Sequence, residues 1–184
     1  MTKPITIAPI EILHEGRHVV LKSAGGWEYA ERRQVSGCVG ILAVTAENKL
    51  LLVEQFRPPV QCNVIELPAG LAGDIAGTED EPLAVAAKRE LLEETGYAAG
   101  RMYFLCEGPV SAGLSTEIIS FFHAQDLHKV HGGGGDHSED IRVHEVPLDD
   151  LQSWLAQRRD EGCLIDLKIF TALHFLPHSP PDSR

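Results

Sequence analysis

The sequence predicts a mixed α/β domain in which strands and helices pack as layers. Two features of the chain support this fold class. Short apolar, β-branched segments typical of strands recur along the chain as far as residue 146, and residues 82–95 carry the start and stop signals of one long helix. With 184 residues, 43% of them hydrophobic, the chain is long enough for one globular domain and too apolar to be disordered.

The first predicted strands come in pairs. Residues 17–22 and 27–34 are expected to be strands on either side of a glycine-containing turn at 24–26. Residues 39–45 and 50–55 are apolar and β-branched, and the short polar segment between them predicts that they form a hairpin. Further strands are predicted at 102–107, 118–124 and 141–146.

The clearest helix is predicted from Pro82 to Thr95. Proline in the first turn of a helix loses no hydrogen bond, and Gly96 stands just past the end, where a left-handed residue is favoured. Two more helices are predicted at 148–160 and 165–176, and the proline-rich tail 177–184 is expected to be disordered.

Charge and cysteine content exclude several classes of partner. The chain has 27 Asp and Glu against 16 Lys and Arg, a net charge of −11 without a basic run, which argues against nucleic acid as a partner. The longest apolar runs fall far short of the ~20 residues that span a bilayer, and the first residues lack the pattern of a signal peptide. The four cysteines form no CxxC pair and are expected to be reduced thiols, so we predict a soluble cytoplasmic protein.

One side of the predicted helix is strongly charged. At 100° per residue, Arg89, Glu90, Glu93 and Glu94 gather on one side and apolar residues on the other. Three carboxylates on one arc repel each other, and a bound divalent cation would remove that repulsion. Oxygen ligands favour Mg²⁺ or Mn²⁺ over Zn²⁺. The alternative is a solvated face stabilised by the Arg89–Glu93 pair. The apolar side is expected to comprise Ala84, Val85, Ala87, Leu91 and Leu92.

Residues 89–97, Arg-Glu-Leu-Leu-Glu-Glu-Thr-Gly-Tyr, resemble the second half of the box of the Nudix hydrolase family, with Glu81 eight residues before Arg89 as in that motif. Residues 66–70, Glu-Leu-Pro-Ala-Gly, resemble the strand and loop that lead into the box. The chain departs from the box in one place, because ten residues separate Gly70 from Glu81 where the motif has five. A loop lengthens at small entropic cost, but the insertion weakens the expected role of Glu81 more than that of the later glutamates.

The resemblance implies the Nudix fold, a mixed β-sheet packed between helices, and Mg²⁺-dependent hydrolysis of a nucleoside diphosphate linked to another moiety. By position in the box, Glu90 and Glu94 would be metal ligands, and Glu93 a ligand or a support. Arg89 would hold the glutamates in place. The carbonyl of Ala69 would add a further ligand, since a hard cation accepts backbone oxygen.

Beyond the box, the resemblance extends over about residues 16–176 and indicates the ADP-ribose pyrophosphatase-like branch of the family. That branch implies an N-terminal strand extension over residues 1–36 that forms a homodimer, followed by the Nudix domain over residues 37–176. The segments that carry this resemblance are 27–29, 54–58, 66–70 and 139–143.

The same resemblance assigns roles to residues outside the box. Glu139 would complete the metal site, Arg57 would grip a phosphate, and Trp27 or Tyr29 would stack on a nucleobase across a dimer interface. The alternatives are a surface ion pair for Arg57 and core packing for the two aromatic residues.

Four consecutive glycines at 132–135 precede Asp136, His137 and Glu139. Such a run suits a mobile active-site loop, and the alternative is a surface linker. The candidates for the general base are Glu93, Asp136 and His137. Histidine is among them because a side chain that titrates near neutrality is suited to that role. A zinc site is an alternative use of the histidines in this part of the chain, but their spacings fit no standard zinc pattern. These histidines are His123, His128, His131, His137 and His144.

ADP-ribose is the expected substrate, hydrolysed to AMP and ribose 5-phosphate. Enzymes of that type tend to show Ser-Pro-Gly downstream of the box, and Ala112 stands here at the proline position. A GDP-mannose or other nucleotide-sugar pyrophosphatase is therefore an alternative. An alternative from another class is a non-catalytic, nucleotide-sensing Nudix domain, although the complete set of charged residues at 89–94 argues against it.

Overall fold

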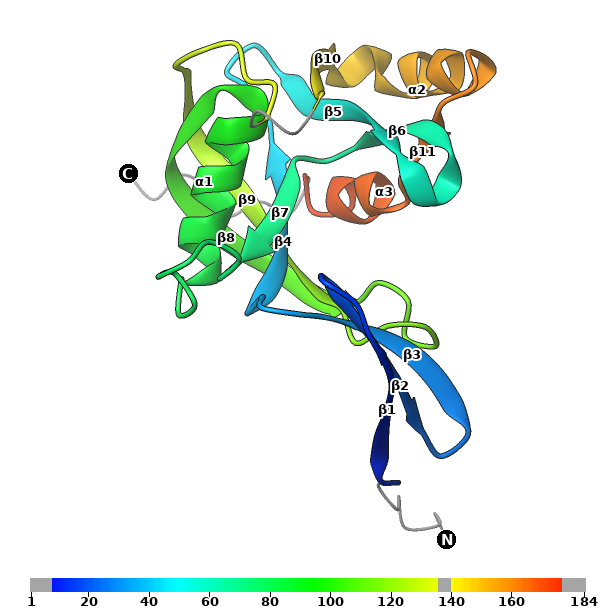
Figure 1. Ribbon diagram of the computed structural model, residues 1–184. Helices are drawn as coiled ribbons and strands as arrows, with labels where there is room; N and C mark the ends of the chain where they lie inside the picture. The colour runs from blue at the N-terminus through cyan, green and yellow to red at the C-terminus, as the bar shows by residue number, and fades with distance from the viewer. Residues whose placement is uncertain (1–7, 136–139, 177–184) are drawn as a thin grey trace, which may run out of the picture.

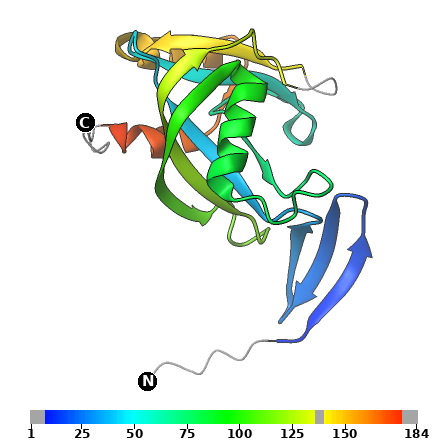
Figure 2. The same ribbon diagram turned by 90° about the vertical axis from the view of Figure 1, so that its left-hand side faces the viewer.

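The N-terminal part of the chain forms a small antiparallel sheet of its own. The computed structural model describes residues 8–135 and 140–176. Strands β1 (Ile10–Glu15), β2 (Val19–Ala24) and β3 (Trp27–Arg32) pair in the order β1-β2-β3. This sheet projects away from the rest of the molecule (Figures 1 and 2). The strand pair predicted at 17–22 and 27–34 is confirmed as β2 and β3, and β1 is an additional strand.

The central sheet is mixed and has the strand order β7-β4-β9-β8. Strand β4 is parallel to β9 and antiparallel to β7, so β4 is an interior strand and β7 an edge strand. The strands predicted at 102–107 and 118–124 are confirmed as parts of the longer β8 and β9. The bounds are Gly37–Ala43 for β4, Ala69–Ala72 for β7, Tyr97–Pro109 for β8 and Ile118–Lys129 for β9.

A second four-stranded sheet has the order β10-β5-β6-β11. The hairpin predicted from residues 39–45 and 50–55 is wrong, because a single bridge between Val44 and Leu50 joins β4 to β5 within the described residues. Both strands are buried along most of their length, so each takes an interior place in a different sheet. The bounds are Lys49–Arg57 for β5, Cys62–Glu66 for β6, Arg142–Pro147 for β10 and Leu164–Ile165 for β11, with a short 3₁₀ turn at Pro58–Val60.

Helix α1 (Leu83–Thr95) covers one face of the central sheet (Figure 2). It begins after Pro82 and ends as predicted at Gly96, whose φ is 76° and whose amide donates to the Leu92 carbonyl at 2.9 Å. The predicted apolar side is partly wrong, because Val85 is exposed and Glu94 is buried. Because small alanine side chains fit either side, the local sequence of α1 only weakly determines the rotation of the helix about its axis. The contacts of α1 with β4, β7 and β8 determine that rotation.

Helix α2 (Leu151–Asp160) packs on the outer side of the second sheet, and helix α3 (Lys168–Leu173) lies between the two sheets (Figure 1). Helix α2 follows a 3₁₀ turn at Leu148–Asp150, and together they confirm the helix predicted at 148–160. Helix α3 is shorter than the predicted 165–176, because Leu164 and Ile165 pair with β6. One core cluster joins both sheets to α2 and α3, and a second lies under α1.

The architecture confirms the predicted α/β class, with the strands of the described residues divided among the N-terminal sheet and two mixed four-stranded sheets rather than joined in one. Among residues 8–135 and 140–176, no helix combines the length and the apolar character needed to cross a membrane. All four cysteines are free thiols. The tail 177–184, for which disorder was expected, lies outside the described residues.

Candidate active site

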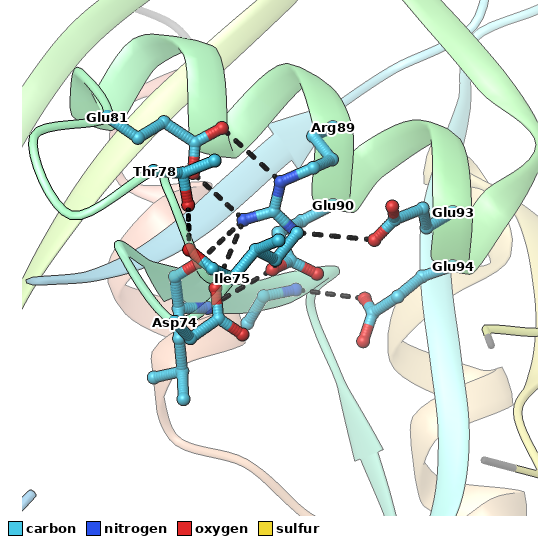
Figure 3. A network of polar contacts seen from close by, with 10 residues as sticks. Asp74, Ile75, Thr78, Glu81, Arg89, Glu90, Glu93 and Glu94 are labelled. Atoms are coloured by element: carbon cyan, nitrogen blue, oxygen red, sulfur yellow. Dashed lines mark hydrogen bonds and ion pairs between the residues drawn. The ribbon is translucent and has the colours of Figure 1, made fainter. Parts of the chain in front are cut away.

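The charged side of α1 contacts the edge strand β7 through two carboxylates (Figure 3). The amide of Ala69 donates to Glu94 Oε2 at 3.0 Å, and the amide of Leu71 donates to Glu90 Oε1 at 3.2 Å. An edge strand presents main-chain groups that lack a strand partner, and helix side chains bind two of them here. Since the amide and carbonyl of one residue in an antiparallel strand point to the same side, the Ala69 carbonyl faces this edge as well.

Gly70, between these two amides, permits the close approach of Glu90 to the strand. A Cβ atom at position 70 would lie 1.9 Å from Cδ of Glu90 and 2.2 Å from its Oε1. No carboxyl group fits beside a side chain at that distance. The glycine is therefore required by the position of Glu90.

We expect Gly70→Ala to impair activity far more than stability. The group that must move is the end of a flexible side chain, so the free energy of unfolding should fall by about 1 kcal/mol. The Glu90 carboxylate must shift by about 1 Å or more, a displacement that costs on the order of 100-fold in rate. Gly108→Ala is the matched control, because a Cβ at position 108 meets no atom within 4 Å. Equal turnover in the two variants, measured with Mg²⁺, would contradict the expectation.

Arg89 binds the acidic side chains around it (Figure 3). Its Nη1 donates to Glu90 at 2.8 Å and to Glu93 at 3.3 Å. Its Nε and Nη2 donate to Glu81 at 3.3 and 3.0 Å. The insertion before Glu81 therefore leaves that residue inside the cluster, in contact with Arg89.

The inserted loop also adds an acidic residue that sequence reasoning missed. Asp74 lies 3.5 Å from Nη2 of Arg89, which in addition donates to the Leu71 carbonyl at 2.8 Å. The acidic composition of the loop is visible in the sequence, but the path that returns Asp74 to the helix is not. Arg89 is thus the cation shared by carboxylates from the loop and from α1.

The cluster carries excess negative charge in a largely buried place. Burial raises the pKa of Glu90 to about 7, although Arg89 acts in the opposite direction, and Glu93 and Asp74 add repulsion. Glu94 is 4% exposed. Carboxylate oxygens are the ligands that Mg²⁺ prefers. The carboxylate oxygens of Glu90 and Glu94 therefore fit a divalent cation that prefers oxygen ligands.

The described residues bring together part of the predicted ligand set. Within 8–135 and 140–176, no three Asp, Glu, His or Cys side chains form a ready-made metal site. Asp136, His137 and Glu139 lie outside the described residues, so their roles stay predictions. Glu93 has 46% of its side chain exposed, against 12% for Glu90, and is the more open to water of the two.

The position of Glu90 predicts a pH dependence of stability for the metal-free protein. Its pKa is about 7 in the folded chain, against an ordinary value of 4.5. Between these values the folded state binds more protons than the unfolded state, so the free energy of unfolding falls as pH rises from 4.5 to about 7. We expect Tm in EDTA to decline over this interval, and Glu90→Gln to remove that part of the decline. The same decline in both proteins would contradict this.

The predicted substrate-binding residues lie apart from one another. Arg57 Nε contacts Glu66 Oε2 at 2.6 Å, so the ion pair considered as its alternative role is formed, with 42% of the Arg57 side chain exposed. Trp27 is 65% exposed, so it does not pack in a core of this chain. Trp27 and Tyr29 both lie on β3, in the projecting sheet, and one chain does not bring them to the acidic cluster (Figures 1 and 2).

The histidines that the structure describes are dispersed. His123 is buried in β9, and burial lowers its pKa. His128 is exposed, whereas His131 accepts a hydrogen bond from the amide of Gly133 at 3.0 Å. His144 Nε2 lies 2.9 Å from Oε2 of the buried Glu54. The zinc alternative gains no support from this arrangement.

Comparisons with known proteins agree with the motif. A family model described as the NUDIX domain matches residues 36–166. The chain is 34% identical over 151 residues to an ADP-ribose pyrophosphatase of Bacillus subtilis (strain 168), covering 80% of this chain and 77% of that protein. It is 33% identical over 166 residues to a GDP-mannose pyrophosphatase of Escherichia coli (strain K12), covering 80% and 84%.

The chain is also similar to a relative with a different description and to one solved structure. The chain is 34% identical over 141 residues to a methanol dehydrogenase activator of Bacillus methanolicus, covering 76% of this chain and 71% of that protein. A crystal structure of an ADP compounds hydrolase superposes with a TM-score of 0.63 at 24% identity, covering 80% of this chain and 82% of that one. The last similarity supports the fold.

Proposed function

The chain belongs to the Nudix family, and from this premise we propose that it hydrolyses the pyrophosphate bond of a nucleoside diphosphate sugar. ADP-ribose is the first candidate substrate, with AMP and ribose 5-phosphate as products. One observation carries the proposal: Glu90 and Glu94 are held on the amides of β7 beside Arg89. An array of carboxylates on a strand edge suits metal-assisted phosphate chemistry.

The proposed ligands of Mg²⁺, or of Mn²⁺ in its place, are Glu90, Glu94, Glu139 and the Ala69 carbonyl. When bound, the cation offsets phosphate charge and lowers the pKa of the attacking water. Arg89 keeps the glutamates in position through its hydrogen bonds. The general base that takes the proton from that water is one of Glu93, Asp136 and His137.

Arg57 is proposed to bind a substrate phosphate. Its Nε is engaged by Glu66, and its half-exposed guanidinium has further donors for a bidentate contact with phosphate oxygens. The Glu66 contact would keep the side chain in one orientation before substrate arrives.

GDP-mannose is the second candidate substrate, because a GDP-mannose pyrophosphatase is similar to this chain at nearly the same identity. A panel of ADP-ribose, GDP-mannose and other nucleotide sugars, assayed with Mg²⁺ for released monophosphate, separates the two. We expect the highest kcat/KM with ADP-ribose. Binding without turnover across the panel would identify a nucleotide sensor and overturn the proposal.

We also propose that residues 1–36 form a dimerising extension of a catalytic domain over residues 37–176, and that the protein is cytoplasmic. The projecting sheet supports the first part, since it leaves several large apolar side chains exposed. In a homodimer, the partner's sheet would carry Trp27 and Tyr29 to the site that this chain leaves without them. The four free thiols agree with a reducing compartment. The exposed side chains are Ile10, Ile12, Leu13, Val19, Leu21 and Trp27.

Trp27→Ser is expected to weaken the dimer and to raise KM for the nucleotide sugar. A buried interface tryptophan contributes about 2 kcal/mol or more, so the dimer Kd should rise by at least about tenfold. Leu167→Ser is the control, because Leu167 is an apolar residue beside α3 that is exposed to a similar or greater extent, 77% against 65%. Sedimentation equilibrium and KM report the result. A wild-type protein that is monomeric and still hydrolyses the nucleotide sugar would contradict the proposal.

A further inference from the structure

The segment of four glycines is bound to the C-terminal end of α1. The amide of Gly134 donates to the Glu94 carbonyl at 2.8 Å, and the amide of Gly135 donates to the Glu93 carbonyl at 3.1 Å. A helix end leaves its last four carbonyls without an intrahelical partner. Two of those carbonyls in α1 therefore find their donors in a loop that is about forty residues further along the chain.

The conformation of this segment requires glycine at its centre. Residues 133, 134 and 135 have φ values of 72°, 115° and 77°. A Cβ atom on Gly133 would lie 2.5 Å from the Glu94 carbonyl oxygen and 2.5 Å from the Thr95 carbonyl carbon. The obstacle is helix backbone, which cannot move aside like a side chain. At Gly132, by contrast, a Cβ atom meets nothing within 4 Å.

A second set of contacts holds the preceding residues against the same helix end. The amides of Val130 and His131 donate to the Gly96 carbonyl at 2.8 and 3.3 Å, and within the segment the amide of Gly133 donates to Nδ1 of His131 at 3.0 Å. Residues 133–135 thus lie against the backbone of a helix end, and the mobility of the glycine loop stays a prediction. Their lack of side chains serves close contact between two backbones.

We propose that residues 133–135, here called the glycine anchor, position the acidic end of α1, where Glu93 and Glu94 stand. This inference rests on the proposed function. The anchor binds the carbonyls of Glu93 and Glu94, whose side chains belong to the candidate site. One contact between a loop and a helix end thus fixes the part of α1 that carries two carboxylates of the candidate site.

The test compares Gly133→Ala with the neighbouring control Gly132→Ala. We expect Gly133→Ala to lower kcat by about 100-fold, the effect of a displacement of about 1 Å, with a smaller change in KM. Its affinity for Mn²⁺, measured by titration without nucleotide, should fall as well. Gly132→Ala should stay within about twofold of wild type in both measurements, because residue 132 lies outside the anchor.

Amide hydrogen exchange of glycine-labelled protein tests the anchor without activity. In wild type, the amides of Gly134 and Gly135 should exchange slowly, and Gly133→Ala should accelerate both. If Gly133→Ala does not fold, Gly134→Ala replaces it, because the nearest atom to a Cβ there is the Ile141 carbonyl oxygen at 3.9 Å and the residue is strained through its φ alone.

Two results would overturn the inference. One is fast exchange of both amides in wild type, and the other is wild-type kcat and Mn²⁺ affinity in a variant whose amides have lost protection. Failure of the proposed function is distinguishable from both. A wild-type protein that hydrolyses no nucleotide of the panel would still show, through exchange and Mn²⁺ affinity, whether the anchor positions the acidic end of α1.

Discussion

Glutamine in place of Glu94 is expected to reduce kcat for nucleotide-sugar hydrolysis by about a thousandfold while the protein stays folded. Glu94 is 4% exposed, and its Oε2 accepts a hydrogen bond from the Ala69 amide at 3.0 Å. A glutamine has the same shape, and its amide oxygen can accept that bond. The variant loses one negative charge from the proposed metal ligands, and metal-assisted charge stabilisation of several kcal/mol corresponds to a loss on this scale.

The measurement is kcat at saturating Mg²⁺, read as released monophosphate, together with Tm. Glu47→Gln is the control, because Glu47 is an exposed glutamate in the loop between β4 and β5 and makes the same change of charge. Its kcat should equal that of wild type. Wild-type turnover in a folded Glu94→Gln protein would remove Glu94 from the site and contradict the proposed ligand set.

Lysine in place of Arg89 is expected to lower both stability and activity. Arg89 donates to Glu81, to Glu90 and to the Leu71 carbonyl, and its side chain is 20% exposed. Lysine keeps the charge but lacks the planar fork that reaches these acceptors together. Hydrogen bonds lost to buried carboxylates should lower the free energy of unfolding by about 2 kcal/mol and Tm by about 6 °C.

The kcat of Arg89→Lys should also fall, by about 100-fold, because Glu90 and Glu93 lose the contacts that orient them. Arg101→Lys is the matched control, since Arg101 makes a two-pronged contact with Asp126 at 2.6 and 3.1 Å on strands β8 and β9. Both partners there are more exposed, and solvent screening leaves such surface pairs little effect on stability. Equal loss of kcat in the two variants would show that Arg89 has no positioning role.

The ends of the helix that carries the site, and the grouping of its charged residues, were predictable from local sequence. Pro82 and Gly96 mark its ends, and the order of charged residues between 89 and 94 places them on one side by helical period. These features depend on neighbours in the chain, since proline, glycine and i,i+4 spacing act within a few residues. The family resemblance and the family model agree on this part of the chain.

Long-range contacts were predicted less well. The expected hairpin between 39–45 and 50–55 is replaced by two strands in different sheets, because apolar segments of this length are compatible with several partners. Asp74 joins the cluster because an inserted loop folds back to Arg89. Residues 133–135, within the run of four glycines, contact a helix end that lies far away in the sequence, and composition gave no sign of this contact.

The sequence by itself determined the helix, its four charged residues and the family, because each is encoded in spacing within one segment. The tertiary structure decided which partners those residues have. Glu90 and Glu94 accept bonds from the amides of β7, Gly70 admits the first of them, and residues 134 and 135 cap the helix from a distant loop. Main-chain donors are the same at every residue, so local sequence does not specify which of them a carboxylate or a carbonyl will meet. That pairing follows from the path of the whole chain.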